Sequence, residues 1–272
     1  MLTPTQQLIV GRGELEVRVD GPVATAEDRS PLVFLHEGLG SVDLWRTFPD
    51  DVRHEVGGPL TMVYSRHGHG SSSVVDEPRR TDYMHHEADA VLPELLDRLG
   101  IVRPVLIGHS DGASIALLYA GASHCVAGLV LLAPHVFVED RSIAGIEAAR
   151  DAYRRGDLAQ RMARYHRNAD MTFQGWNDVW LSADFRSWNI TERLPTIDCP
   201  VLLIQGADDQ YGSVAQLDAI DRGVRGPCRS VVVPGVGHAP HLEAPDVTRQ
   251  AVVEFITSLP RVTAGADTPH LR

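Results

Sequence analysis

Short runs of consecutive apolar residues recur along the chain and alternate with stretches of helical periodicity. Continuous apolar runs are typical of strands that are covered on both faces of a parallel sheet. The runs lie at 31–35, 60–64, 104–107, 128–134, 200–206 and 230–234. The pattern between them, clearest over residues 81–99, has the apolar spacing of amphipathic helices. The alternation predicts an α/β fold with a doubly wound, mostly parallel sheet.

The first residues follow a different pattern. Leu8 to Val10 and Leu15 to Val19 flank a Gly-Arg-Gly turn, and the second run alternates apolar with charged residues. Such alternation predicts a half-exposed strand, so the two runs are interpreted as an antiparallel hairpin at a sheet edge.

Residues 136–195 interrupt the alternation of strands and helices. They contain helical stretches and many aromatic residues but no run typical of a strand. We interpret them as a helical lid inserted between two parts of one core, 1–135 and 196–260. Residues 261–272 show no periodicity and are predicted to form a loose tail.

The apolar run at 104–107 leads directly into Gly108-His109-Ser110-Asp111-Gly112 and then into a helical pattern. Glycines two positions on either side of a serine allow a sharp strand-to-helix turn that exposes its hydroxyl group. The following helix directs its N-terminus at this hydroxyl, where it favours developing negative charge. Ser110 is therefore predicted to be a catalytic nucleophile.

A serine nucleophile needs a general base and an acid that orients the base. Asp209 follows the run at 200–206, and His238 follows the run at 230–234. Both therefore belong to the sheet edge that carries Ser110. Their order along the chain, Ser-Asp-His, is that of an α/β-hydrolase. The alternatives for the acid are Asp208, Glu139 and Asp140, and the alternative for the base is His241.

With these motifs, nearly the whole chain resembles the α/β-hydrolase fold superfamily. His36-Glu37-Gly38-Leu39-Gly40 is similar to its oxyanion loop, and the sequence from Arg66 to Ser72 is similar to its Arg-x-x-Gly-x-Ser turn. The resemblance implies an oxyanion hole made from the backbone N–H of Asp111 together with that of Gly38 or Leu39. Candidate pocket residues are His36, Glu37, His109, Trp176, Trp180 and Trp188.

These residues predict a serine hydrolase that cleaves a small carboxylic ester, lactone or thioester through an acyl-enzyme on Ser110. One alternative is hydrolysis of carbon–carbon bonds in ring-fission products, although relatives with that activity typically carry asparagine before the serine and methionine after it. The others are acyl transfer to an alcohol, cofactor-free haloperoxidase activity, and a non-catalytic small-ligand receptor. Serine at this position argues against haloalkane dehalogenase and epoxide hydrolase activity, which use aspartate. No metal, nucleotide or flavin cofactor is implied.

Composition narrows the choice of partners. The formal net charge of −11 argues against nucleic acid or an anionic membrane and leaves a small-molecule substrate. All 25 basic residues are arginines, which excludes chemistry that needs a lysine. The three cysteines are widely spaced and no signal peptide is evident, so we expect a cytoplasmic protein. Monomer and homodimer both remain open.

Overall fold

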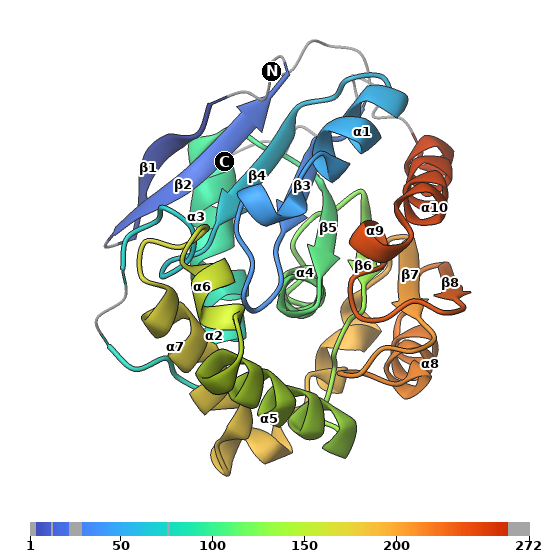
Figure 1. Ribbon diagram of the computed structural model, residues 1–272. Coiled ribbons are helices and arrows are strands. Elements are labelled where there is room, and N and C mark those ends of the chain that lie inside the picture. The colour runs from blue at the N-terminus through green and yellow to red at the C-terminus, as the bar shows by residue number, and fades with distance from the viewer. Residues whose placement is uncertain (1–3, 12, 22–28, 75–76, 261–272) are drawn as a thin grey trace.

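The computed structural model describes residues 4–11, 13–21, 29–74 and 77–260. Within these residues the chain forms an eight-stranded sheet of order β1-β2-β4-β3-β5-β6-β7-β8 (Figure 1). The strands are β1 (Gln6–Val10), β2 (Gly13–Asp20), β3 (Leu32–Leu35), β4 (Thr61–Ser65), β5 (Val105–His109), β6 (Gly128–Leu132), β7 (Val201–Gly206) and β8 (Cys228–Val233). β1 and β2 form an antiparallel hairpin, and β3 to β8 are parallel to one another. Both the mostly parallel sheet and the hairpin at its edge are therefore confirmed. The expected half exposure of residues 15–19 is wrong, because Glu16 and Arg18 are buried and have polar partners of their own.

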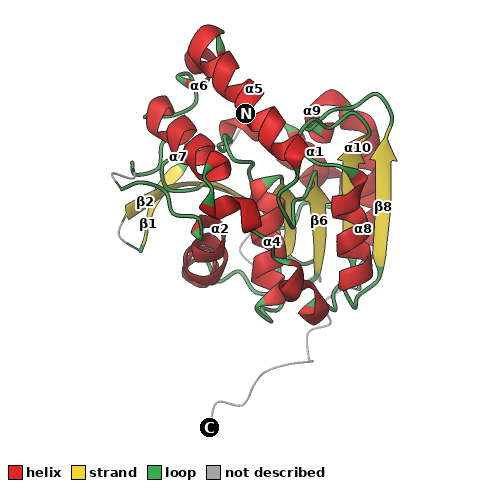
Figure 2. Cartoon of the chain, turned by 90° about the horizontal axis from the view of Figure 1, so that it is seen from below, coloured by secondary structure: helices red, strands yellow, loops and turns green. Residues whose placement is uncertain are grey.

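Helices cover both faces of the sheet, as Figure 2 shows. Along β3, Leu32 and Phe34 belong to one core cluster, whereas Val33 and Leu35 belong to the other. The first cluster packs beneath α1 and α10, and the second packs beneath α3, α4 and α8. These helices are α1 (Phe48–Glu55), α3 (Leu92–Arg98), α4 (Asp111–Gly121), α8 (Val214–Gly223) and α10 (Pro245–Ser258). Among the described residues, no helix has both the length and the apolar character needed to cross a membrane.

Short helical turns complete the core. The turn η1 follows β3, α2 and the π-helical η2 precede α3, and α9 precedes α10. Their bounds are η1 (Asp43–Trp45), α2 (Tyr83–His86), η2 (Glu87–Val91) and α9 (Pro240–Glu243).

The segment between β6 and β7 is helical. It forms α5 (Asp140–Arg155), α6 (Leu158–Met162), α7 (Ala169–Leu181), η3 (Asp184–Ser187) and η4 (Thr191–Thr196). Figure 1 shows α5, α6 and α7 gathered at one end of the molecule. This segment is attached to the loop after β4, because Thr172 Oγ1 donates to the Gly68 carbonyl at 2.5 Å and Arg167 N–H donates to the Gly70 carbonyl at 2.8 Å. The division into core and lid stays a prediction, and the tail at 261–272 lies outside the described residues.

Strand register brings several loops together at one edge of the sheet, the edge formed by the C-terminal ends of the parallel strands. Leu35 at the end of β3 pairs with Gly108 of β5, and His109 pairs with Leu132 of β6. Gly206 at the end of β7 pairs with Val233 at the end of β8. Because parallel strands end together, the loops that follow β3, β5, β7 and β8 meet at this edge.

Candidate active site

Ser110 occupies a strained turn between β5 and α4. Its backbone has φ 53° and ψ −115°, an unfavourable conformation for a residue with a side chain. A Cβ atom on Gly112 would collide with the Leu35 carbonyl, and one on Gly108 would collide with the backbone of Gly112. The two glycines are therefore required by close backbone packing, and Ser110 stands directly before the first residue of α4.

Asp209 and His238 form a hydrogen-bonded pair at the same edge. Nδ1 of His238 lies 2.9 Å from Oδ1 and 2.8 Å from Oδ2 of Asp209. The carboxylate is buried, and it also accepts hydrogen bonds from Tyr211 N–H at 2.8 Å and from Gln205 Nε2 at 2.7 Å. Burial alone would raise the pKa of Asp209, but the His238 hydrogen bond, the His238 charge and the Tyr211 hydrogen bond lower it below its usual value. The carboxylate is thus kept charged and holds the proton on Nδ1 of His238.

The second ring nitrogen of His238 is left available. Among the described residues, no hydrogen bond reaches His238 Nε2, and Ser110 Oγ has no partner either. In enzymes without substrate, hydrogen bonds between a nucleophile and its base are often long and shorten when substrate binds. The geometry therefore joins Asp209 to His238 and shows no hydrogen bond between His238 Nε2 and Ser110 Oγ.

The rival candidates have other surroundings. Asp208 is exposed, and Glu139 accepts hydrogen bonds from Ser213 N–H at 2.9 Å and from Gln216 Nε2 at 2.8 Å. Asp140 lies at the surface, 3.5 Å from Arg186. His241 is buried against the rings of Trp45, Phe48 and His109. The structure thus brings Asp209 and His238 together and places these four alternatives elsewhere.

The loop after β3 is held through its carbonyl groups. The Glu37 carbonyl accepts from Arg66 Nη2 at 2.8 Å, and the Gly38 and Leu39 carbonyls each lie 3.0 Å from a histidine Nε2, that of His69 and that of His166. In contrast, no described residue accepts a hydrogen bond from the N–H of Gly38, Leu39 or Asp111. These N–H groups are therefore free to bind an oxyanion, and both Gly38 and Leu39 remain candidates.

A buried network lies beside Ser110 that sequence patterns did not reveal. The Asp111 carboxylate accepts from the Tyr83 hydroxyl at 2.5 Å and lies 3.5 Å from Arg66 Nη1. Trp180 Nε1 donates to the same hydroxyl at 3.1 Å. Burial lowers the pKa of Arg66, but Asp111 and its other neighbours raise it above its usual value, so Arg66 stays charged. The only sequence signal was the position of Arg66 in the Arg-x-x-Gly-x-Ser turn.

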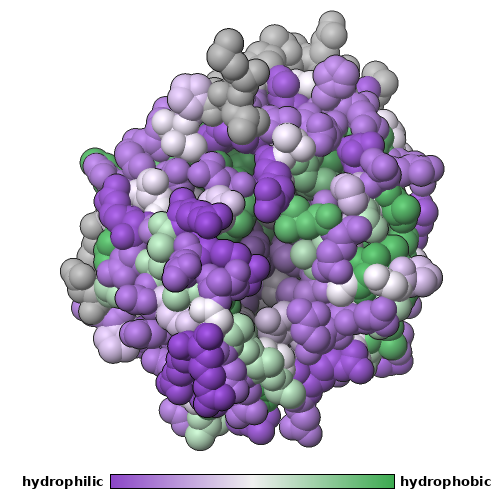
Figure 3. All heavy atoms as spheres, in the orientation of Figure 1, coloured by the Kyte–Doolittle hydropathy of each residue, from purple (hydrophilic) through white to green (hydrophobic). Residues whose placement is uncertain are grey.

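The candidate pocket residues fall into two groups. Three tryptophans come from the helical segment: Trp176 packs on Gly38, Trp180 bonds to Tyr83, and Trp188 stacks on Phe185 with ring centroids 5.3 Å apart. Figure 3 shows the face of the molecule seen in Figure 1, and its surface is hollowed near the centre, beside the place where Figure 1 shows α4.

The second group lies in the loops around Ser110. His36 is buried beneath the loop after β3, where its Nδ1 lies 2.7 Å from the Glu37 carbonyl and its Nε2 accepts from Arg66 N–H at 3.0 Å. Glu37 and His109 lie against each other, with Glu37 Oε2 3.4 Å from His109 Nδ1.

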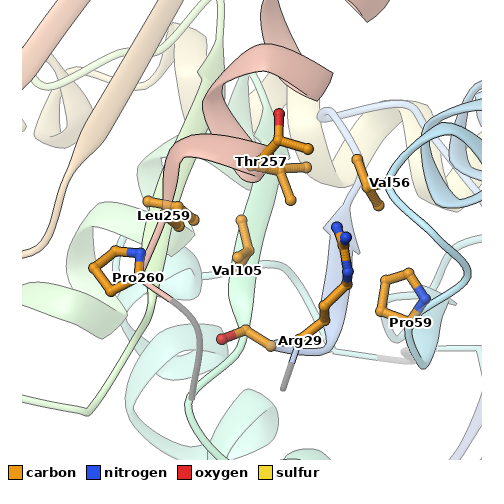
Figure 4. Close-up of a pocket in the computed structure, with 9 residues that line it drawn as sticks. Arg29, Val56, Pro59, Val105, Thr257, Leu259 and Pro260 are labelled. Carbon is orange, nitrogen blue, oxygen red and sulfur yellow. The ribbon is translucent and has the colours of Figure 1, made fainter. Parts of the chain in front are cut away.

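A separate cavity lies at the other end of the parallel strands, where β5 begins (Figure 4). It measures about 90 Å³ and includes Val105, the first residue of β5, in its wall. Arg29, Val56, Pro59 and Leu259 also line it. Since Ser110 follows the other end of β5, this cavity is not part of the candidate active site.

Comparisons with known proteins agree with the fold. The model of the alpha/beta hydrolase family matches residues 32–251. The chain is 29% identical to the esterase YbfF of Escherichia coli, over 84% of this chain and 94% of that protein. It is 24% identical to a proline iminopeptidase of Lactobacillus delbrueckii, over 81% of this chain and 88% of the relative. The crystal structure of the enol-lactonase from Burkholderia xenovorans superposes with a TM-score of 0.72 at 18% identity, covering 93% of this chain and 100% of that one. The chain therefore belongs to the alpha/beta hydrolase family and is a hydrolase enzyme of that type.

Proposed function

We propose that this protein hydrolyses a small carboxylic ester, lactone or thioester through an acyl-enzyme formed on Ser110. The observation that carries the proposal is the Asp209–His238 pair, which stands at the sheet edge where Ser110 is held in its strained turn. This combination supplies a nucleophile, a base and a group that orients the base.

The first half of the reaction forms the acyl-enzyme. His238 Nε2 takes the proton of the Ser110 hydroxyl while Oγ attacks the carbonyl carbon. Asp209 keeps the imidazole ring in position and stabilises its positive charge. When the tetrahedral intermediate collapses, the bond to the leaving alcohol or thiol breaks, and His238 protonates that group.

The second half returns the enzyme to its initial state. His238 removes a proton from water, and the resulting hydroxide attacks the acyl-enzyme. Collapse of this second intermediate breaks the bond to Ser110 Oγ, which regains its proton from His238 and releases the carboxylic acid.

Backbone donors stabilise both tetrahedral intermediates. The N–H groups of Asp111 and of Gly38 or Leu39 lack partners among the described residues and belong to the loops that flank Ser110. Donors fixed in advance where negative charge develops contribute about 2.7–4 kcal/mol each in enzymes of this chemistry. The carbonyl contacts of Arg66, His69 and His166 support this placement, because they fix the loop before substrate binds.

Aromatic residues support a preference for an apolar acyl or alcohol group. Trp176 and Trp180 belong to α7, and their rings lie over Gly38 and beside Tyr83. We assign residues 136–195 the role of a lid over this pocket. The ester and lactone substrates named for two of the relatives fit the same chemistry.

Initial rates for the wild type and Ser110→Ala test the proposal. The substrates would be p-nitrophenyl acetate to octanoate, an aryl-acid methyl ester, an acyl-CoA and a ring-fission dienoate. We expect ester or thioester turnover that falls by roughly three to six orders of magnitude in the variant. Turnover of the dienoate alone would instead support carbon–carbon bond hydrolysis. A folded wild type that is inactive on every substrate would contradict the proposal and favour a ligand receptor.

A further inference from the structure

His109, the residue before Ser110, contacts the backbone of the proposed base. Its side chain is 3% exposed, and its Nε2 lies 2.8 Å from the carbonyl oxygen of His238. Since a carbonyl only accepts, Nε2 must carry the proton in this contact. The ring centroids of His109 and His238 are 5.1 Å apart. His109 is therefore attached to the main chain of the residue whose side chain is proposed to move protons.

Glu37 occupies the other side of the same ring. Its Oε2 lies 3.4 Å from His109 Nδ1, and a Cβ atom on Gly40 would collide with this carboxylate. A small residue at position 40 thus makes room for Glu37 to fold back toward His109. Glu37 also precedes Gly38, one of the two candidate oxyanion donors in its loop.

The charges of the two groups support each other. Burial lowers the pKa of His109, but the Glu37 carboxylate and the His238 carbonyl raise it by more, so it stands above its ordinary value. Burial raises the pKa of Glu37, yet His109 and His36 lower it well below its ordinary value. Each group therefore favours the charged form of the other, an imidazolium beside a carboxylate.

The remaining neighbours of His109 define its electrostatic environment. Asp209 raises its pKa, and the rings of His241 and Trp45 pack against it, with centroids 4.8 Å and 6.4 Å away. Burial and the charge of His109 both lower the pKa of His241, which leaves His241 neutral. Glu37 is thus the carboxylate that directly pairs with His109.

We propose that His109 and Glu37 form a second histidine–carboxylate pair that positions the catalytic base. The cationic His109 donates to the His238 main chain, and Glu37 balances the charge. His109 thereby connects three loops: the His238 loop, the turn that contains Ser110, and the oxyanion loop, which it contacts through Glu37. This role rests on the proposed serine hydrolase mechanism and requires no contact between His109 and substrate.

The other hydrogen bonds of the His238 loop show why the donor from His109 matters. Glu243 accepts from Gly237 N–H at 2.7 Å and from Ala239 N–H at 3.0 Å, so it holds the chain on both sides of His238. The His238 carbonyl is held by His109 alone among the described residues. Hydrogen bonds from charged donors are about twice as strong as neutral ones. Loss of this donor therefore frees the peptide that carries the catalytic imidazole.

The pair also predicts a particular pH dependence. When pH rises through the raised pKa of His109, the ring loses one proton, and the negative charge of Glu37, 3.4 Å from Nδ1, favours keeping the remaining proton on that nitrogen. Nε2 then presents a lone pair to the His238 carbonyl, and the contact becomes repulsive. Turnover of the wild type should therefore decline along an inflection above pH 6.5, the ordinary value of an imidazole.

Three variants separate these effects: His109→Leu, His109→Gln and Glu37→Gln. His109→Leu removes the donor and should lower kcat by about 10- to 100-fold with little change in KM. His109→Gln keeps an N–H donor of similar reach and should recover most of the lost kcat. His241→Leu is the matched control, since His241 lies in the same cluster without a hydrogen bond to His238, and its kcat should stay within about twofold.

Glu37→Gln provides a test that a purely structural role would not satisfy. Without the carboxylate, the largest influence that raises the pKa of His109 is gone, so this pKa falls, and the neutral ring can place its single proton on Nε2. The inflection in kcat should therefore move to lower pH. At neutral pH, kcat should fall by about three- to tenfold because a neutral donor replaces a charged one.

The assays would follow the best ester from the substrate panel, together with thermal unfolding of every variant and amide hydrogen exchange of residues 235–240. Faster exchange at these amides in His109→Leu, but not in His109→Gln, is expected. If the wild type is active, and His109→Leu and Glu37→Gln have the same kcat, pH profile and amide exchange as the wild type, this inference is overturned while the serine hydrolase mechanism stands. An inactive wild type that also resists a fluorophosphonate would instead overturn the serine hydrolase mechanism.

Discussion

Replacing Arg66 by methionine removes the side chain that joins the two halves of the proposed oxyanion hole. Nη2 of Arg66 donates to the Glu37 carbonyl at 2.8 Å, next to the Gly38 N–H. Nη1 lies 3.5 Å from the carboxylate of Asp111, whose backbone N–H is the second proposed donor. The variant therefore perturbs both donors and leaves a buried carboxylate without its cation.

The structure sets the size of the expected effect. The side chains of Arg66 and Asp111 are 5% and 1% exposed, so water cannot replace the lost partner. Two unit charges 3.5 Å apart attract by about 5 kcal/mol at an effective dielectric constant of about 20. Breaking a buried pair by removing one member costs about 3–5 kcal/mol. Since Tyr83 still donates to Asp111, we expect a loss of about 3–4 kcal/mol in the free energy of unfolding.

The double variant Arg66→Met/Asp111→Asn separates charge balance from loop positioning. It leaves no uncompensated charge and should recover most of the free energy of unfolding. Its kcat should remain about tenfold low, because the Glu37 carbonyl has still lost a charged donor.

Urea unfolding and initial rates on the best ester measure the two quantities. A free energy of unfolding for Arg66→Met within about 1 kcal/mol of the wild type would refute the electrostatic reasoning. A double variant with wild-type kcat would show that Arg66 only neutralises Asp111.

Three further predictions concern other parts of the site. Asp209→Asn should lower kcat by about 10⁴-fold, whereas Asp208→Asn should leave it nearly unchanged in the same steady-state assay. Burial lowers the pKa of His135 to about 4, so an unfolded chain binds a proton more readily below pH 6.5. The contribution of His135 to the free energy of unfolding should therefore fall by about 3 kcal/mol between pH 6.5 and about 4, so that in urea unfolding stability declines less steeply in His135→Gln than in the wild type, and equal slopes would contradict this. Gly112→Ala should destabilise the fold by about 1–3 kcal/mol or more in thermal unfolding, since its Cβ collides with backbone, and an unchanged melting temperature would argue against the close packing.

Much of the fold could be predicted because its signals are local. Continuous apolar runs marked the parallel strands, and alternation over residues 15–19 marked β2, the inner strand of the hairpin, while β1 is the edge strand. Parallel strands end at a common edge, so the loops containing Ser110, Asp209 and His238 could be expected to meet. Asp209 and its alternative Asp208 both follow the run at 200–206, and it is the structure that places Asp208 at the surface and Asp209 against His238.

Side-chain partners between distant segments could not be predicted in the same way. The contact between Tyr83 and Asp111 depends on how α2 packs beside the turn before α4, which no short pattern encodes. His166 reaches the Leu39 carbonyl across 127 positions of the chain. For Glu37, a solvated side chain and a loop-orienting carboxylate were both compatible with the sequence. Only the register of β3 against β5 places it beside His109.

Trapping of the acyl-enzyme tests the central claim most directly. The wild type would be mixed with a slowly hydrolysed p-nitrophenyl ester, quenched in acid, digested and examined by mass spectrometry. The account predicts an acyl group on Ser110, absent from Ser110→Ala and formed far more slowly in His238→Ala. Turnover by Ser110→Ala at the wild-type rate, with no acyl group on any serine, would contradict it.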